Sequence, residues 1–167
     1  MKNLLRIVFI VALATFANTT FAQKLAHINR TELIQSMPDF KTAVEKLEAY
    51  GKELQSETQE LQAEYLKKLQ DYQQNYSTWT DEKKQVAEEK LTDLQGRIQE
   101  QDRVNQNRMD NKQEELFTPI LKKVTDAINK IAKAGGYVFV FESTAVHYVD
   151  ETQSTNLISA AKTELGI

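Results

Sequence analysis

The sequence of 167 residues predicts an α+β fold, in which a long antiparallel coiled-coil hairpin of helices is joined to a small β-body. Residues 39–118 contain no proline and repeat apolar side chains every three or four residues, which is typical of coiled coils. Before and after this stretch lie short runs that alternate in polarity or are rich in β-branched and aromatic residues, as strands are. We therefore divide the chain into a helical arm, residues 39–118, and a β-body formed by residues 23–38 and 119–167.

Residues 1–22 have the layout of a secretory signal peptide. Lys2 and Arg6 form a basic lead, an apolar segment of 11 residues follows, and small residues precede a cleavage point after Ala22. The apolar segment is too short to span a bilayer. The alternative, an uncleaved anchor, would need a stop-transfer continuation that the sequence lacks. We predict an exported protein without stable membrane insertion.

Composition and charge exclude several classes of function. The chain has no cysteine, so neither a disulfide nor a lipid-bearing cysteine is expected. Without the signal peptide, 19 basic residues stand against 24 acidic ones, which gives a net charge of about −5. This acidic balance argues against a nucleic-acid partner.

The first piece of the body is predicted over residues 24–38. Leu25 and His27 alternate with Ala26 and Ile28, which is typical of a strand. The following stretch, TELIQSM, favours one or two turns of helix that end at a proline.

The arm is predicted to reverse near Trp79, where capping-type residues crowd between two helical patterns. The seam of the first helix is formed by Val44, Leu47, Gly51, Leu54, Thr58, Leu61, Tyr65, Lys68 and Tyr72. The seam of the returning helix is formed by Ala87, Leu91, Leu94, Ile98, Gln101, Asn105, Arg108 (or Met109), Lys112 and Leu116.

A reversal centred on Trp79 pairs Tyr65 with Leu94 and Leu54 with Asn105. The seam is then apolar near the tip and polar at mid-length. Burial of a leucine side chain in the seam stabilises the hairpin by about 1.5–3 kcal/mol, and a polar residue or a glycine at the same position does not provide this stabilisation. We therefore hypothesise an arm that bends near Gly51.

Pro38 and Pro119 are the only prolines of the chain and lie opposite each other at the foot of the predicted hairpin. Ser36 and Thr118 are candidate helix caps before them, and proline is tolerated as a first helical residue. Both prolines, together with Gly51, are predicted hinge positions.

The last part of the body is predicted to be a β-hairpin and a helix. YVFVFE at 137–142 forms one strand, Ser143 and Thr144 the turn, and residues 145–151 the second strand. Thr152 or Ser154 is expected to cap the closing helix.

One closing helix covers one face of this small sheet at best, so the other apolar face needs a second chain. We predict an obligate homo-oligomer. Its interface is predicted to contain Ile28, Val138, Phe139, Val140, Phe141, Val146 and Tyr148.

No catalytic, cofactor or metal site is predicted. His27 and His147 are the only histidines, each lies in a predicted strand, and the chain lacks the HExxH and GxSxG motifs and a phosphate-binding glycine loop. The acidic residues interleave with lysines on helix faces, which is typical of a solvated surface. We predict that the protein is not an enzyme.

These segments in order resemble one known family. KLAHINRTELIQSMPDF, the heptad hairpin, ELFTPILKKVTDAINKIAKAGGYVFVFESTAVHYVDE and the closing helix are similar to the Skp/OmpH family of periplasmic chaperones over the whole mature chain. The resemblance implies a homotrimer whose arms enclose unfolded outer-membrane β-barrel proteins in the periplasm, without ATP, cofactor or catalysis. The better-known members are strongly basic, whereas this chain is acidic, which puts charge steering and lipopolysaccharide contact in doubt.

Client binding is then expected to depend on aromatic side chains, which can contact both apolar and polar segments of an unfolded chain. The candidates on the arm are Tyr50, Tyr65, Tyr72, Tyr76 and Trp79. The alternative is that they fill the seam between the two helices, which is favoured for Tyr65 and Tyr72.

A competing function is a coiled-coil scaffold or spacer of the cell envelope that binds one folded partner. A scaffold favours a continuous apolar seam, whereas the polar positions at mid-arm favour the chaperone.

Overall fold

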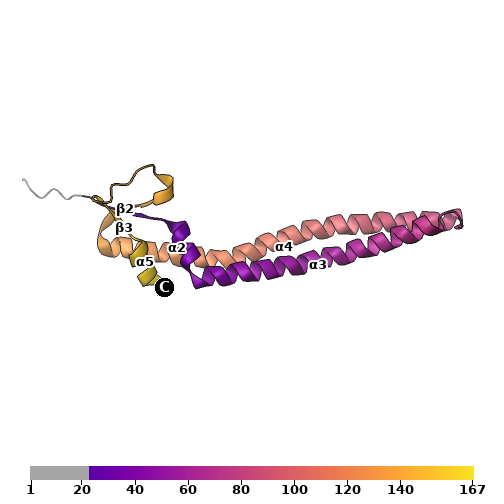
Figure 1. The fold of residues 1–167 in the computed structure, drawn as a ribbon, viewed down its shortest axis with the longest axis horizontal. Coiled ribbons are helices and arrows are strands. Elements are labelled where there is room, and N and C mark those ends of the chain that lie inside the picture. The colour runs from indigo at the N-terminus through magenta and orange to yellow at the C-terminus, as the bar shows by residue number, and fades with distance from the viewer. Residues whose placement is uncertain (1–22) are drawn as a thin grey trace, which may run out of the picture. The chain divides into compact units, whose positions relative to one another are not determined.

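The structure, a computed structural model, describes residues 23–167, and the predicted signal peptide lies outside them. The element order is β1 (Lys24–Ile28), α2 (Arg30–Ser36), α3 (Pro38–Asn75), α4 (Asp81–Gly135), β2 (Tyr137–Glu142), a short 3-10 helix η1 (Ser143–Ala145), β3 (Ser154–Asn156) and α5 (Ile158–Leu165), as Figure 1 shows. The described chain is mostly helical with one small sheet, which confirms the predicted α+β class.

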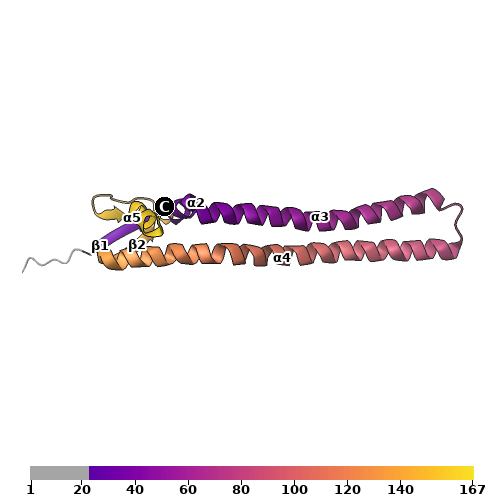
Figure 2. The same cartoon turned by 90° about the horizontal axis from the view of Figure 1, so that it is seen from below.

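The chain forms two compact units, which we describe separately. The arm unit comprises Thr31–Thr125, and the sheet unit combines the chain up to Arg30 with Asp126–Gly166. In the arm unit, α3 and α4 run antiparallel side by side (Figures 1 and 2). The predicted helical hairpin is therefore confirmed.

The reversal between α3 and α4 lies where the sequence predicts it. The amide groups of Thr78 and Trp79 donate to the carbonyl of Asn75 at 2.9 and 3.1 Å, which closes α3. Thr80 then caps α4, because its hydroxyl accepts from the amide of Lys83 at 3.4 Å.

The predicted helix starts at the two prolines are only half right. Pro38 is the first residue of α3, but Ser36 does not cap it: the Ser36 hydroxyl donates to the carbonyl of Leu33 at 2.7 Å, at the end of α2. Pro119 lies inside α4, so the predicted cap at Thr118 is wrong. Good helix formers on both sides carry the helix through this proline, although it provides no amide for the carbonyl four residues before it.

The sheet unit has the strand order β2-β1-β3, and β1 pairs in parallel with both neighbours. The predicted strands at 24–28 and 137–142 are confirmed. The predicted turn at Ser143 and Thr144 is the short helix η1, and the predicted second hairpin strand at 145–151 is wrong, because residues 146–151 form an irregular loop. Parallel strands need a long connection instead of a tight turn.

The connection ends in a turn built on Asp150, and β3 starts directly after it. The Asp150 carboxylate accepts from the amide and the hydroxyl of Thr152 at 2.9 and 2.7 Å. Ser154 therefore belongs to β3, and neither it nor Thr152 caps the closing helix as predicted. Instead, the side-chain carbonyl of Asn156 accepts from the amide of Ile158 at 3.0 Å, at the start of α5.

The core of the sheet unit is small. Its buried apolar residues are Ala26, Ile28, Ala127, Ile128, Leu157 and Ala161. Gly166 closes α5 with a φ of 75°, a left-handed conformation that glycine adopts readily. Among residues 23–167, no helix combines the length and the apolar character that crossing a membrane requires.

Candidate functional site

β2 lies at the edge of the sheet and exposes its apolar side chains. Val138, Phe139 and Phe141 are 52, 55 and 42% exposed, and the two phenylalanine rings stack with centroids 5.9 Å apart. Alternate residues of a strand point to opposite faces, so both faces of β2 carry exposed apolar groups. The apolar side chains of the predicted strand at 137–142 are thus open to water in the single chain.

The loop after β2 extends this surface with Val146 and Tyr148, the latter 80% exposed. Val140 is half-buried. Ile28 differs from the other residues predicted for the interface, because it is 1% exposed and belongs to the chain's own core. We call Val138, Phe139, Phe141, Val146 and Tyr148 the β2 apolar surface.

A cavity of about 330 Å³ opens beside the β2 apolar surface, with Leu25, His27, Phe141, Val149 and Asp150 among its lining residues. His27 is 5% exposed, and its Nδ1 lies 2.9 Å from the hydroxyl of Ser154 on β3. Hydrogen bonds from the hydroxyl and the amide of Thr152 hold the pKa of Asp150 below its usual value.

The two histidines have different surroundings. His27 links β1 to β3, whereas His147 is exposed in the loop and not in the strand predicted for it. Among residues 23–167, no three His, Cys, Asp or Glu side chains are grouped as metal ligands would be.

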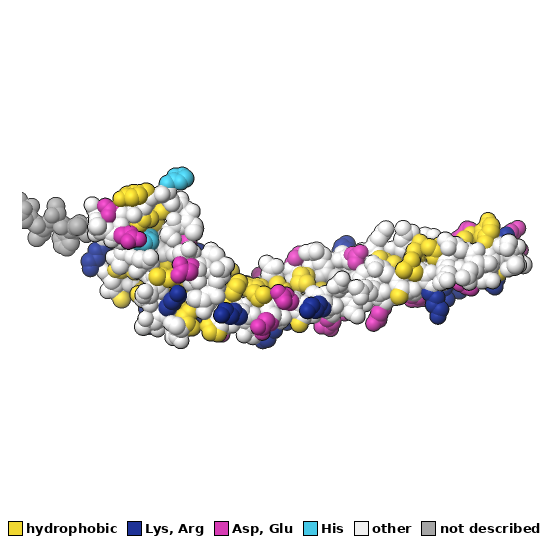
Figure 3. Space-filling view, in the orientation of Figure 1, with side chains coloured by type: hydrophobic (Ala, Val, Ile, Leu, Met, Phe, Trp, Pro, Cys, Tyr) yellow, Lys and Arg dark blue, Asp and Glu magenta, His cyan; other side chains and the backbone are white. Residues whose placement is uncertain are grey.

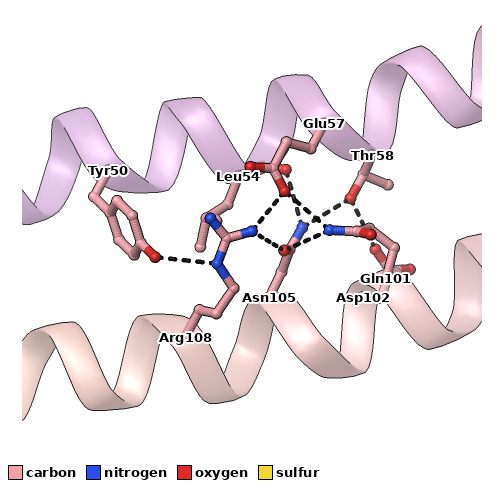
Figure 4. A network of polar contacts seen from close by, with 8 residues as sticks. All are labelled: Tyr50, Leu54, Glu57, Thr58, Gln101, Asp102, Asn105 and Arg108. Atoms are coloured by element: carbon pink, nitrogen blue, oxygen red, sulfur yellow. Dashed lines mark hydrogen bonds and ion pairs between the residues drawn. The ribbon is translucent and has the colours of Figure 1, made fainter.

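The middle of the arm contains a network of polar contacts between α3 and α4 (Figure 4). Arg108 Nη1 lies 2.6 Å from Glu57 Oε2, and Arg108 Nε donates to the Tyr50 hydroxyl at 3.1 Å. The same Glu57 oxygen accepts from the Gln101 side-chain amide at 2.9 Å. The hydrogen bonds to Glu57 and Tyr50 raise the pKa of Arg108, so the guanidinium stays charged.

Asn105 anchors the network to the backbone. Its Nδ2 donates to the carbonyl of Leu54 at 3.0 Å and to the Thr58 hydroxyl at 3.2 Å, which confirms the predicted pairing of Leu54 with Asn105. At Gly51, a Cβ atom would lie 2.9 Å from the end of the Met109 side chain, so Met109 faces Gly51. The predicted polar seam at mid-arm is confirmed.

The arm tip holds an aromatic cluster. The Tyr72 ring packs edge-on against Tyr76 and Trp79, with centroids 5.3 and 6.1 Å apart. The Tyr72 hydroxyl donates to Glu88, and this hydrogen bond raises the pKa of Tyr72 to about 12. Lys83 Nζ lies 4.2 Å from the centroid of the Trp79 ring.

The predicted client-binding aromatics therefore divide into two groups. Tyr50 joins the mid-arm network, and Tyr65 is half-buried on α3. Tyr72, Tyr76 and Trp79 gather at the tip, where Tyr76 is 50% exposed.

A pocket of about 190 Å³ lies beside this cluster, and we call it the tip pocket. It is lined by Lys68, Asp71, Trp79, Lys83, Val86, Ala87 and Lys90. Elsewhere on the arm, small hydrophobic patches alternate with acidic and basic side chains, as Figure 3 shows for one face.

The two prolines predicted as hinges lie near the open end of the hairpin. Pro119 lines a groove with Ala43 and Ile120, and an ion pair of 2.5 Å between Lys123 and Asp39 joins the helices there. Gly51 lies in the continuous helix α3.

Comparison with known proteins gives the family. Residues 24–165 match the family described as Outer membrane protein (OmpH-like). The chain belongs to the OmpH-like family. This confirms the resemblance that the sequence motifs indicate.

Relatives of this OmpH-like chain include proteins named Chaperone protein Skp. The one from Yersinia enterocolitica is 26% identical, over 86% of this chain and 87% of that protein. The one from Photorhabdus laumondii is 29% identical, over 84% and 85%. A crystal structure described as an outer membrane chaperone (OmpH-like) from Caulobacter crescentus CB15 has the same fold, with a TM-score of 0.73 at 10% identity over 87% of this chain and 86% of that one.

Sequence reasoning did not find the tip pocket of this OmpH-like chain. Lys68 is predicted as a seam residue, and no role is predicted for Lys83 or Lys90. The available signal was the position of these lysines on either side of a single tryptophan at the reversal.

Proposed function

We propose that this OmpH-like protein is an ATP-independent periplasmic holdase chaperone. It binds unfolded outer-membrane proteins in a cavity between helical arms and prevents their aggregation. The observation that carries the proposal is the β2 apolar surface, because a single chain leaves it open to water while its core is small. The family match and the relatives named as chaperones support the same conclusion.

The β2 apolar surface acts as the assembly site of a homotrimer. Burial of each exposed phenylalanine or valine contributes about 1.5–3 kcal/mol, so association of β2 edges recovers stability that one chain lacks. In this proposal residues 23–38 and 119–167 form the oligomerisation body, and residues 39–118 form the client-binding arm.

The arms hold clients by binding alone. A protein that binds the unfolded state lowers the concentration of free unfolded chains, and no chemical step is required. The clients contact two aromatics of the tip, the exposed Tyr76 and the half-buried Trp79, which offer both apolar and polar edges.

The test uses the mature chain, residues 23–167. A urea-unfolded outer-membrane β-barrel protein is diluted into buffer with and without it, and light scattering follows aggregation. We expect suppression at about one trimer per client, with a sedimentation mass of three chains. A monomer that leaves aggregation unchanged would instead support the scaffold, which binds a folded partner.

A further inference from the structure

The tip pocket combines an apolar floor with a cationic rim. Trp79, Val86 and Ala87 provide the apolar part, and Val86 is 49% exposed. Lys68 comes from α3, while Lys83 and Lys90 come from α4. The pocket therefore forms only when the hairpin brings the two helices together.

The size of the tip pocket limits what can enter it. Drug-sized ligands occupy pockets of about 300–1,000 Å³, whereas a benzene ring fills a cavity of about 150 Å³. The tip pocket has about 190 Å³. It accommodates one aromatic side chain and no larger molecule.

The charge of the tip pocket is opposite to that of the chain. Three lysines and one acidic residue line it. The acidic residue, Asp71, accepts a hydrogen bond of 2.9 Å from the side chain of Asn75. None of the three lysines forms an ion pair with a carboxylate of the described residues.

This local charge decides what binds. Exposed charges further apart than about 8–10 Å are screened at physiological salt, so a group in the pocket interacts with the three lysines more than with the acidic chain as a whole. A carboxylate next to an aromatic ring satisfies both parts of the pocket. The ring enters beside Trp79, and the carboxylate reaches the ammonium groups on the rim.

We propose that the tip pocket binds segments of unfolded clients in which an aromatic side chain adjoins an acidic residue. This inference rests on the proposed function. It adds a preference for acidic client segments, which the negative net charge of the chain would not suggest.

The single tryptophan of the chain makes the proposal directly testable, because Trp79 lines the pocket. The probe is an acetylated, amidated peptide of sequence Gly-Asp-Phe-Asp-Gly, titrated into the full mature protein while Trp79 emission is recorded. We expect a saturable change that weakens with added salt. Replacing Phe by Ala or both Asp by Asn in the peptide should abolish it.

Two matched double variants separate local from net charge. K68Q/K90Q removes two charges from the pocket, and K41Q/K52Q removes two exposed charges elsewhere on α3. Two exposed ion pairs are lost, so K68Q/K90Q should weaken peptide binding about twofold to thirtyfold. K41Q/K52Q should leave it unchanged, and Val86→Ser should weaken it without a change in charge.

Three results would overturn the proposed binding at the tip pocket. The first is the absence of a saturable change in Trp79 emission, and the second is equal weakening of peptide binding by the two lysine variants. The third is displacement of the peptide only by vesicles rich in phosphatidylglycerol, which would indicate that the pocket binds a lipid surface instead. The aggregation assay runs in parallel with the same proteins. If aggregation is suppressed but the peptide does not bind, only the proposal for the tip pocket is rejected. If the peptide binds but aggregation is not suppressed, the proposed holdase function is rejected.

Discussion

The two units of this chain place polar and apolar side chains in opposite ways. The arm unit has polar residues in its interior seam, where Glu57, Asn105 and Arg108 bond across the helices. The sheet unit has apolar residues on its outside, where Phe139 and Phe141 are exposed.

The difference shows which unit satisfies its polar and apolar groups within a single chain. Among the described residues, no buried side-chain nitrogen or oxygen lacks a hydrogen-bond partner, so the arm satisfies its polar seam within one chain. The exposed apolar side chains of β2, in contrast, are not covered by other residues of the sheet unit. The core of this unit contains few large side chains. Assembly is therefore expected to depend on the sheet unit and arm stability on the single chain.

The largest effect is expected from removing the β2 apolar surface. The double variant F139S/F141S should shift the sedimentation mass from that of the proposed trimer toward that of a monomer. Loss of two aromatic contacts weakens association by about 3 kcal/mol per copy, or roughly a hundredfold. The matched control is Ile167→Ser, which removes an exposed apolar residue, 42% exposed, outside β2. An unchanged mass for F139S/F141S would contradict the comparison.

The sequence predicts the arm well because its structure depends on local periodicity. The spacing of seam residues and the cluster around Trp79 determine the pairing of Leu54 with Asn105 without knowledge of the rest of the chain. The helix through Pro119 is the exception, since a proline rule applied locally does not count the helix formers around it.

The sheet and the candidate site are harder to predict because they depend on partners far apart in the chain. β3 has only three residues, Ser154–Asn156, with no apolar alternation, and pairing with β1 alone makes it a strand. The tip pocket likewise combines Lys68 of α3 with Lys90 of α4, and helical periodicity alone does not indicate that a pocket forms between them.

The second prediction concerns the arm's own polar seam. Glu57→Ala removes the acceptor of Arg108 and should lower the free energy of unfolding, because the guanidinium is left without its carboxylate. E57L/R108L should instead be close to neutral, since apolar side chains replace both partners. Urea denaturation measures both. Equal losses in the single and double variants would show that the pair does not act as a unit.

The third prediction sharpens the hypothesis of a bend at mid-arm. Gly51→Ala should raise the free energy of unfolding by about 0.5–1 kcal/mol, since alanine favours helix and only the flexible end of Met109 must move. Hydrogen exchange should show weaker protection at 51–58 and 101–108 than at 61–72 in the natural chain. G51A should narrow that difference, and uniform protection before the substitution would contradict the bend.

The smallest effect is expected at Tyr72, which is half-buried in the aromatic cluster of the tip. Its hydrogen bond to Glu88 raises the pKa to about 12, above the ordinary value of 10.0. A raised pKa means that any stabilisation is complete below the ordinary value and is lost as the pH rises toward 12. Tyr72→Phe should therefore lower the melting temperature slightly at neutral pH, where the hydrogen bond is intact, and should have no such effect above about pH 12. It should also remove the last step of the tyrosinate absorbance titration, and a titration without that late step in the natural chain would exclude the bond.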